Sequence, residues 1–170
     1  LSRGLGDVYK RQVSDGSAAY NIMGDWAVAE FDSRNKTFGK DYTAFALPGK
    51  EDVYGFLADS FTLPTGTKNP EATKDWLRFV GSKDAQSTFN QIKGSIPART
   101  DVSPDGFNAY QQKAMKDFKE KKIVSSIAHG AAVPLAWSSE INTAMSKFHQ
   151  DKNTDNFVSA LVAAHDKYAM

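Results

Sequence analysis

Apolar and polar positions divide the chain into a part with strand-length runs and a longer helical part. Short apolar runs lie at residues 18–23 and 42–47, and a segment of extended type covers residues 54–63. Each run ends at glycine or proline, which is typical of strands closed by turns. From residue 69 onward the apolar positions recur at helical spacing instead. The pattern predicts a few strands followed by paired helices, and therefore an α/β or α+β domain.

Each expected helix opens at a capping residue or a proline, the residue types that favour helix starts. The expected helices cover residues 25–34, 70–81, 83–92, 104–118, 134–148 and 155–168. Asp25, Asn69 and Ser82 are the expected N-caps of the first three helices. Trp76 and Trp137 lie on the apolar stripes of their helices, so we expect both to pack in a core.

Composition limits the classes of function. The chain has 170 residues, a net charge of +1 and 41% hydrophobic residues, which suits one ordinary domain with a core of its own. The balanced charge gives no field that would favour nucleic acid or an anionic membrane. No apolar stretch is long enough to cross a bilayer, and the absence of cysteine excludes disulfides and thiolate metal sites. We therefore expect no nucleic-acid partner and no membrane insertion of this segment.

The first twelve residues differ in character from the rest. "LSRGLGDVYKRQ" has no apolar region of the kind found in signal peptides, and the chain starts with leucine. It resembles a translated adapter sequence, so residues 1–12 are expected to be a non-native leader, the alternative being a natural polar tail. Residues 13–170 are then the protein itself, beginning inside a domain.

Catalytic and metal-binding patterns do not account for the sequence. It contains no G-x-S-x-G elbow, no Walker loop and no G-x-G-x-x-G. Its three histidines, His129, His149 and His165, lack the H-E-x-x-H context of a zinc site. We therefore expect no catalytic residue, no metal site and no cofactor.

Four stretches together resemble a known family: "NIMGDWA", "YGFLADSFTLP", "NPEATKDWLRFVGSKDAQSTFNQIKGSIPAR" and "AHGAAVP". They are similar to the C-terminal part of carbohydrate-binding extracellular solute-binding proteins (family 1) of ABC transporters, in particular the glucose/mannose type. The resemblance implies a periplasmic-binding-protein-like fold of type II, with two α/β lobes. The chain would be an incomplete, mainly helical C-terminal part of it. The segment around residues 56–63 would cross the hinge, and the helix pair 69–92 would pack on the missing first lobe.

Four residues are candidates for sugar contact, because a sugar needs an aromatic surface for its C–H faces and fixed polar groups for its hydroxyls. They are Trp26, Asp59, Lys93 and His129. The residues alone leave structural roles open for each: core packing, a carboxylate held by backbone amides, a helix C-terminal cation and an ordinary loop histidine. The resemblance implies that Trp26 stacks on the sugar and that the other three hydrogen-bond its hydroxyls.

The expected function is that of the substrate-binding component of a sugar ABC importer, not an enzyme. It would bind a monosaccharide, a glucose-like hexose, between two lobes and deliver it to the permease subunits. The expected location is periplasmic or extracellular, with a possible lipid anchor at the missing N-terminus. One alternative is the sugar-sensing module of a cytoplasmic regulator. The other is a fragment of a carbohydrate-active enzyme that uses Asp59 and a second carboxylate.

Overall fold

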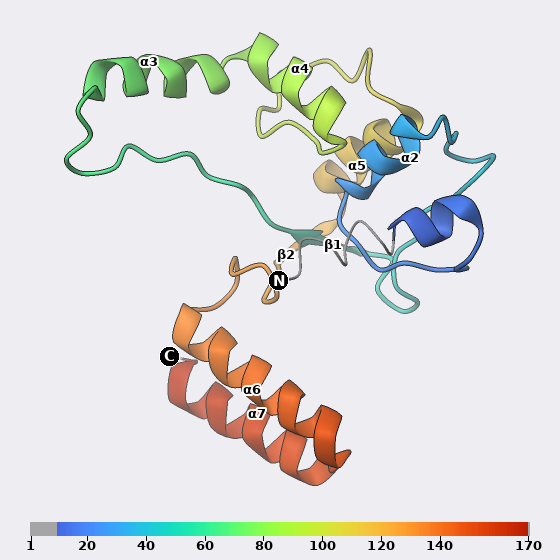
Figure 1. Cartoon of the computed structure of the whole chain (residues 1–170), viewed down its shortest axis with the longest axis vertical. Helices are drawn as coiled ribbons and strands as arrows, with labels where there is room; N and C mark the ends of the chain where they lie inside the picture. The colour runs from blue at the N-terminus through green and yellow to red at the C-terminus, as the bar shows by residue number, and fades with distance from the viewer. Residues whose placement is uncertain (1–9, 170) are drawn as a thin grey trace. The chain divides into compact units, whose positions relative to one another are not determined.

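The structure is a computed structural model that describes residues 10–169, and its residues fall into two units. The first unit runs to Val53 and resumes over Ser60–Lys122, while the second holds Tyr54–Asp59 and the residues from Ile123 onward. Figure 1 shows the elements of both units in chain order. The chain therefore passes between the units three times, at residues 53–54, 59–60 and 122–123. The second of these lies inside the segment that was expected to cross a hinge, and the hinge itself stays a prediction.

Residues 1–9 of the expected leader lie outside the described residues. Residues 10–12 belong to a helical segment that continues to Asp15. The non-native origin of residues 1–12 stays a prediction.

The first unit contains four helices after this segment: α2 (Ala27–Ser33), α3 (Pro70–Val80), α4 (Lys83–Lys93) and α5 (Ala109–Glu120). Two of the expected starts are confirmed. Pro70 opens α3, and the Ser82 side chain accepts a hydrogen bond from the backbone of Ala85 to cap α4. The buried cluster of this unit lies beyond α4, where Ile96 packs against Val102, Phe107 and Met115.

The expected starts of α2 and α5 are wrong in position. Trp26, not Asp25, occupies the N-cap position of α2. α5 begins after Asn108, not at Pro104, because Asn108 and Gln111 form a capping box in which each side chain accepts a hydrogen bond from the other residue's backbone N–H. That reciprocal pair satisfies two amides of the first turn, which is a stronger start signal than the proline.

The expected strands at residues 18–23 and 42–47 are not formed; both segments are irregular. A strand needs a hydrogen-bonded neighbour, and among the described residues the strands that pair are β1 (Val53–Phe56) and β2 (Lys122–Ser125). Tyr42 forms only an isolated bridge with Phe38. They run parallel, with Lys122 N–H donating to Asp52 O at 2.9 Å and Ser126 N–H to Phe56 O at 2.8 Å. Sequence reasoning predicted extended structure at β1 and missed β2.

The second unit contains β1 and β2 apart from their first residues, and the hairpin of α6 (Leu135–Asp151) and α7 (Thr154–Tyr168). The two helices pack antiparallel (Figure 1, orange and red), because Phe148 stacks on Phe157 near the turn and Trp137 stacks on Tyr168 at the other end. Trp137 is thus half-buried in the contact between the two helices and is not part of a buried core, so the expected core packing is met only in part. The same expectation is wrong for Trp76 of the first unit, which is 48% exposed.

Candidate functional site

Trp26 lies in a tight turn that leads into α2. Ala27 N–H donates to Gly24 O and Val28 N–H to Asp25 O, each at 3.0 Å. The indole ring folds back over Gly24, since a Cβ added at Gly24 would lie 2.3, 2.5 and 2.8 Å from three ring carbons. No side chain other than hydrogen fits there, so Gly24 fixes the position of the half-buried ring as well as ending the preceding segment.

Lys93 is the last residue of α4, and it lies next to a glycine that contacts this turn. Gly94 adopts a left-handed conformation (φ 83°), and a Cβ built on it would be 2.9 Å from Ala29 N and 3.4 Å from Asp25 O. The end of α4 therefore rests against the first turn of α2. The Lys93 Nζ atom lies 5.6 Å from the centre of the Phe89 ring. The structure thus brings the Trp26 turn and the Lys93 motif together within the first unit.

Asp59 and His129 belong to the second unit, and each follows one of the two parallel strands. Adjacent parallel strands end at the same edge of a sheet, the edge at which α/β proteins bind ligands. His129 is tied to that edge, because its Nδ1 atom is 2.8 Å from Ser126 Oγ and Ser126 N–H bonds to the last residue of β1. Both side chains are exposed, although Asp59 lies in the apolar sequence context of residues 56–61.

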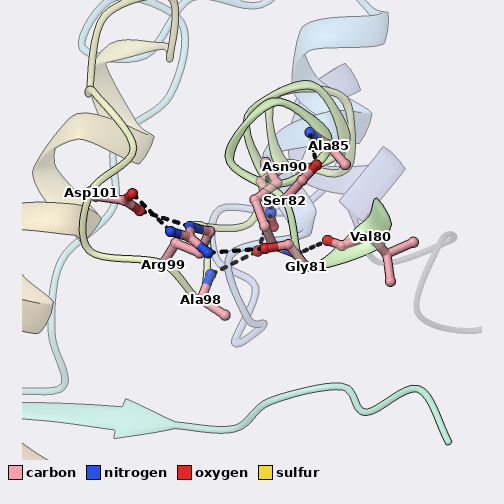
Figure 2. A network of polar contacts seen from close by, with 9 residues as sticks. Val80, Gly81, Ser82, Ala85, Asn90, Ala98, Arg99 and Asp101 are labelled. Carbon is pink, nitrogen blue, oxygen red and sulfur yellow. Dashed lines mark hydrogen bonds and ion pairs between the residues drawn. The ribbon is translucent and has the colours of Figure 1, made fainter. Parts of the chain in front are cut away.

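The loop after α4 is held by a polar network that sequence reasoning missed (Figure 2). Gln86 Nε2 donates to Val80 O at 2.8 Å, and its Oε1 accepts from Ala98 N–H at 3.0 Å. Arg99 donates to Gly81 O at 3.2 Å and forms a two-pronged ion pair with Asp101. The hydrogen bond from Arg99 lowers the pKa of Asp101. These contacts join the α3–α4 corner to the loop that follows Lys93.

An apolar groove of about 510 Å³ lies on α3 and α4, away from the buried cluster of the first unit. Phe61 and Trp76 meet edge to face with ring centres 4.9 Å apart, and Phe79 and Ile92 are 64% and 76% exposed. α3 has no buried residue. Exposed apolar surface of this kind normally marks a contact with something else.

Two further searches cover the described part of the chain. Among residues 10–169, no group of three or more histidine, aspartate and glutamate side chains is arranged to hold a metal ion. None of the helices described is both long and apolar enough to cross a bilayer.

Comparison with known proteins gives one matching family and several relatives. The family described as bacterial extracellular solute-binding protein matches residues 5–117. An ABC transporter extracellular-binding protein of Pyrococcus horikoshii is 38% identical over 91% of this chain and 35% of its own length. A probable sugar-binding periplasmic protein of Mesorhizobium japonicum is 35% identical over 91% of this chain and 39% of its own. A xylose/arabinose-binding protein of Haloferax volcanii is 35% identical over 91% and 34%. The chain thus spans little more than a third of these relatives.

Proposed function

Because the chain belongs to the bacterial extracellular solute-binding protein family, we propose that it is part of the sugar receptor of an ABC importer. The family is extracellular, so the chain is a periplasmic or extracellular protein. The receptor binds a monosaccharide between two lobes and delivers it to the permease subunits of the transporter. It performs no covalent chemistry, in keeping with relatives that are named as binding proteins.

The observation that carries this proposal is the pairing of the candidate residues within each unit. Trp26 and the Lys93 motif meet in the first unit, and Asp59 and His129 follow neighbouring strands in the second. Each pair combines groups suited to a sugar: an aromatic face with a cation, and a carboxylate with an imidazole. The sugar favours closure of the receptor's two lobes around it, as in the hinge closure known for periplasmic binding proteins.

The proposed ligand is a glucose-like hexose. One relative is named as a xylose/arabinose-binding protein, so a pentose is the competing ligand. A pentopyranose lacks the hydroxymethyl group of a hexose. A site that hydrogen-bonds this group therefore binds a pentose more weakly, because the polar groups of the protein that contact it are left buried and unpaired. Calorimetric titration of glucose, mannose, xylose and arabinose distinguishes the two.

The protein for this test is the full reading frame that contains the chain. We expect hexose binding, weakened by Trp26→Ala by about 1–3 kcal/mol, the value of one large buried apolar contact. Trp76→Ala is the matched control for sugar contact, because Trp76 is a tryptophan of the same unit that lies in the separate apolar groove. Equal affinities of the wild type and Trp26→Ala would return Trp26 to a structural role, and no binding of any sugar would refute the function.

Two other functions remain as alternatives to be tested on the same protein. A helix-turn-helix in the full reading frame would favour a regulator, and turnover of a glycoside would favour an enzyme.

We also propose an occupant for the apolar groove of α3 and α4. The relatives are more than twice as long as this chain. In the full protein, part of that additional chain covers Trp76, Phe79 and Ile92. The exposure of these side chains supports this proposal.

A further inference from the structure

The first turn of α5 holds α2 at both ends. Tyr110 Oη donates to Asp25 Oδ1 at 2.5 Å, just before α2 begins. Asn108 Nδ2 donates to Asp32 Oδ2 at 2.8 Å, in the last turn of α2. These partners are 85 and 76 residues apart in sequence, so the hydrogen bonds fix the tertiary position of the short helix. Trp26 lies directly between Asp25 and the start of α2, inside the part that Tyr110 holds.

Gln111, the next residue of this turn, holds the end of α4. Its side chain is among the most buried in the chain at 1% exposure, and Nε2 donates to Asn90 O at 2.7 Å and to Ser95 O at 2.9 Å. The amide oxygen accepts from Asn108 N–H within the capping box. Asn90 and Ser95 lie on either side of Lys93, so one amide group fixes the backbone before and after it.

The two held segments touch each other through Gly94, which lies against the first turn of α2. A displacement of either segment is therefore passed to the other. We infer that Tyr110 and Gln111 are positioning residues of the sugar site, which hold Trp26 and Lys93 in the arrangement that the sugar meets. This inference rests on the proposed function. It goes beyond it in assigning a binding role to residues of α5 that need not contact the sugar.

Tyr110→Phe is the test variant, because it removes one hydroxyl and keeps the ring that packs edge to face on Phe38. The sugar affinity should fall about three- to tenfold, the equivalent of one hydrogen bond. In a background where every other tryptophan of the full reading frame is replaced by phenylalanine, Trp76 and Trp137 among them, Trp26 is the only tryptophan left. Without sugar, acrylamide should quench the fluorescence of Trp26 more strongly in Tyr110→Phe than in the same background with Tyr110, since the ring is held less firmly over Gly24.

Tyr42→Phe is the matched control in the same unit. The Tyr42 hydroxyl is buried and has no hydrogen-bond partner among the described residues, and its ring stacks on Phe31 of α2. Removing this hydroxyl should change neither the sugar affinity nor the quenching of Trp26. A second arm combines Tyr110→Phe with Trp26→Ala. If Tyr110 acts through Trp26, it has no further effect on affinity once the indole is gone.

Gln111→Met tests the second contact, and its effect on affinity should vanish in a Lys93→Met background. Should Gln111→Met fail to fold, the Tyr110 arm decides alone. The inference is overturned if Tyr110→Phe leaves affinity unchanged, or if its effect on affinity persists in full without Trp26. If the wild type binds no sugar, the proposed function fails separately. Acrylamide quenching of the Trp26 fluorescence in Tyr110→Phe then decides whether α5 positions the indole. Unchanged quenching overturns the inference, and increased quenching supports it.

Discussion

Gly94→Ala tests directly whether the end of α4 and the turn of Trp26 form one packed element. The substitution adds a single methyl group at a residue with φ 83°. In the present backbone the new Cβ would lie 2.9 Å from Ala29 N and 3.4 Å from Val28 Cβ. The nearest neighbour is backbone, which cannot rotate away as a side chain can.

The magnitude has two parts. A left-handed conformation costs alanine about 1–2 kcal/mol relative to glycine. Forcing apart well-packed atoms adds about 1–3 kcal/mol. Gly39→Ala is the matched control, because Gly39 also has φ 83° but no atom within 4 Å of the added Cβ. The control should show only the first part, so the free energy of unfolding should differ between the two variants by about 1–3 kcal/mol.

Urea unfolding of the full reading frame, followed by circular dichroism, measures the difference, and calorimetry measures sugar affinity beside it. Gly94→Ala should also weaken sugar binding, because relief of the contact moves Lys93 or the Trp26 turn. Gly39→Ala should leave binding unchanged. Equal losses of stability in the two variants would refute the packing of Gly94 on α2, and an unchanged affinity in Gly94→Ala would refute its link to the site.

Three further predictions address the polar candidates, a buried phenol and the apolar groove. Asp59→Asn, Lys93→Met and His129→Ala should each weaken sugar binding by about 1–3 kcal/mol in calorimetry, with unchanged melting temperatures without sugar; a large melting loss at normal affinity would mark a structural residue. Burial raises the pKa of Tyr42 to about 12. The unfolded phenol therefore loses its proton first as pH rises from about 10, stability falls up to the folded pKa, and urea unfolding at about pH 9 and about pH 11 should show a smaller fall in Tyr42→Phe. Residues 13–170 expressed alone should self-associate in light scattering because the groove is uncovered, whereas a monodisperse monomer would count against the proposed cover.

The helices were predictable from sequence because their determinants are local. Apolar spacing, Pro70 at the first position of α3 and the Ser82 cap of α4 all act within a few residues. The start of α5 was also readable in principle, from asparagine followed three residues later by glutamine, but the proline at residue 104 was given more weight. The strands were less predictable, since an apolar run becomes a strand only where a neighbour pairs with it. Tyr20 and Ile22 remain 77% and 83% exposed without one.

The site shows the same division between local and long-range determinants. The turn that presents Trp26 could be expected from Gly24 and Asp25, although the helix starts one residue later. The partners that hold this turn could not. Asp25 bonds to Tyr110 across 85 residues, and Gln111 reaches Asn90 across 21. No periodicity or spacing indicates such pairs, because a tyrosine and a glutamine on a helix are compatible with many faces.

The distribution of the candidate residues bears on how affinity arises in the proposed receptor. The Trp26 ring is held over Gly24 inside the first unit, and Ser126 holds His129 inside the second. Binding therefore does not have to immobilise these two side chains, and such immobilisation is a principal cost of association.

A variant that loosens this positioning should raise the dissociation constant without changing which sugars compete, because the donors and acceptors are the same and only their ordering has been lost. A variant that replaces a contacting group should change the order of preference among sugars as well. Measuring the four-sugar series on Tyr110→Phe and on Asp59→Asn separates the two cases, and a changed order of preference in Tyr110→Phe would show that α5 acts on the ligand directly.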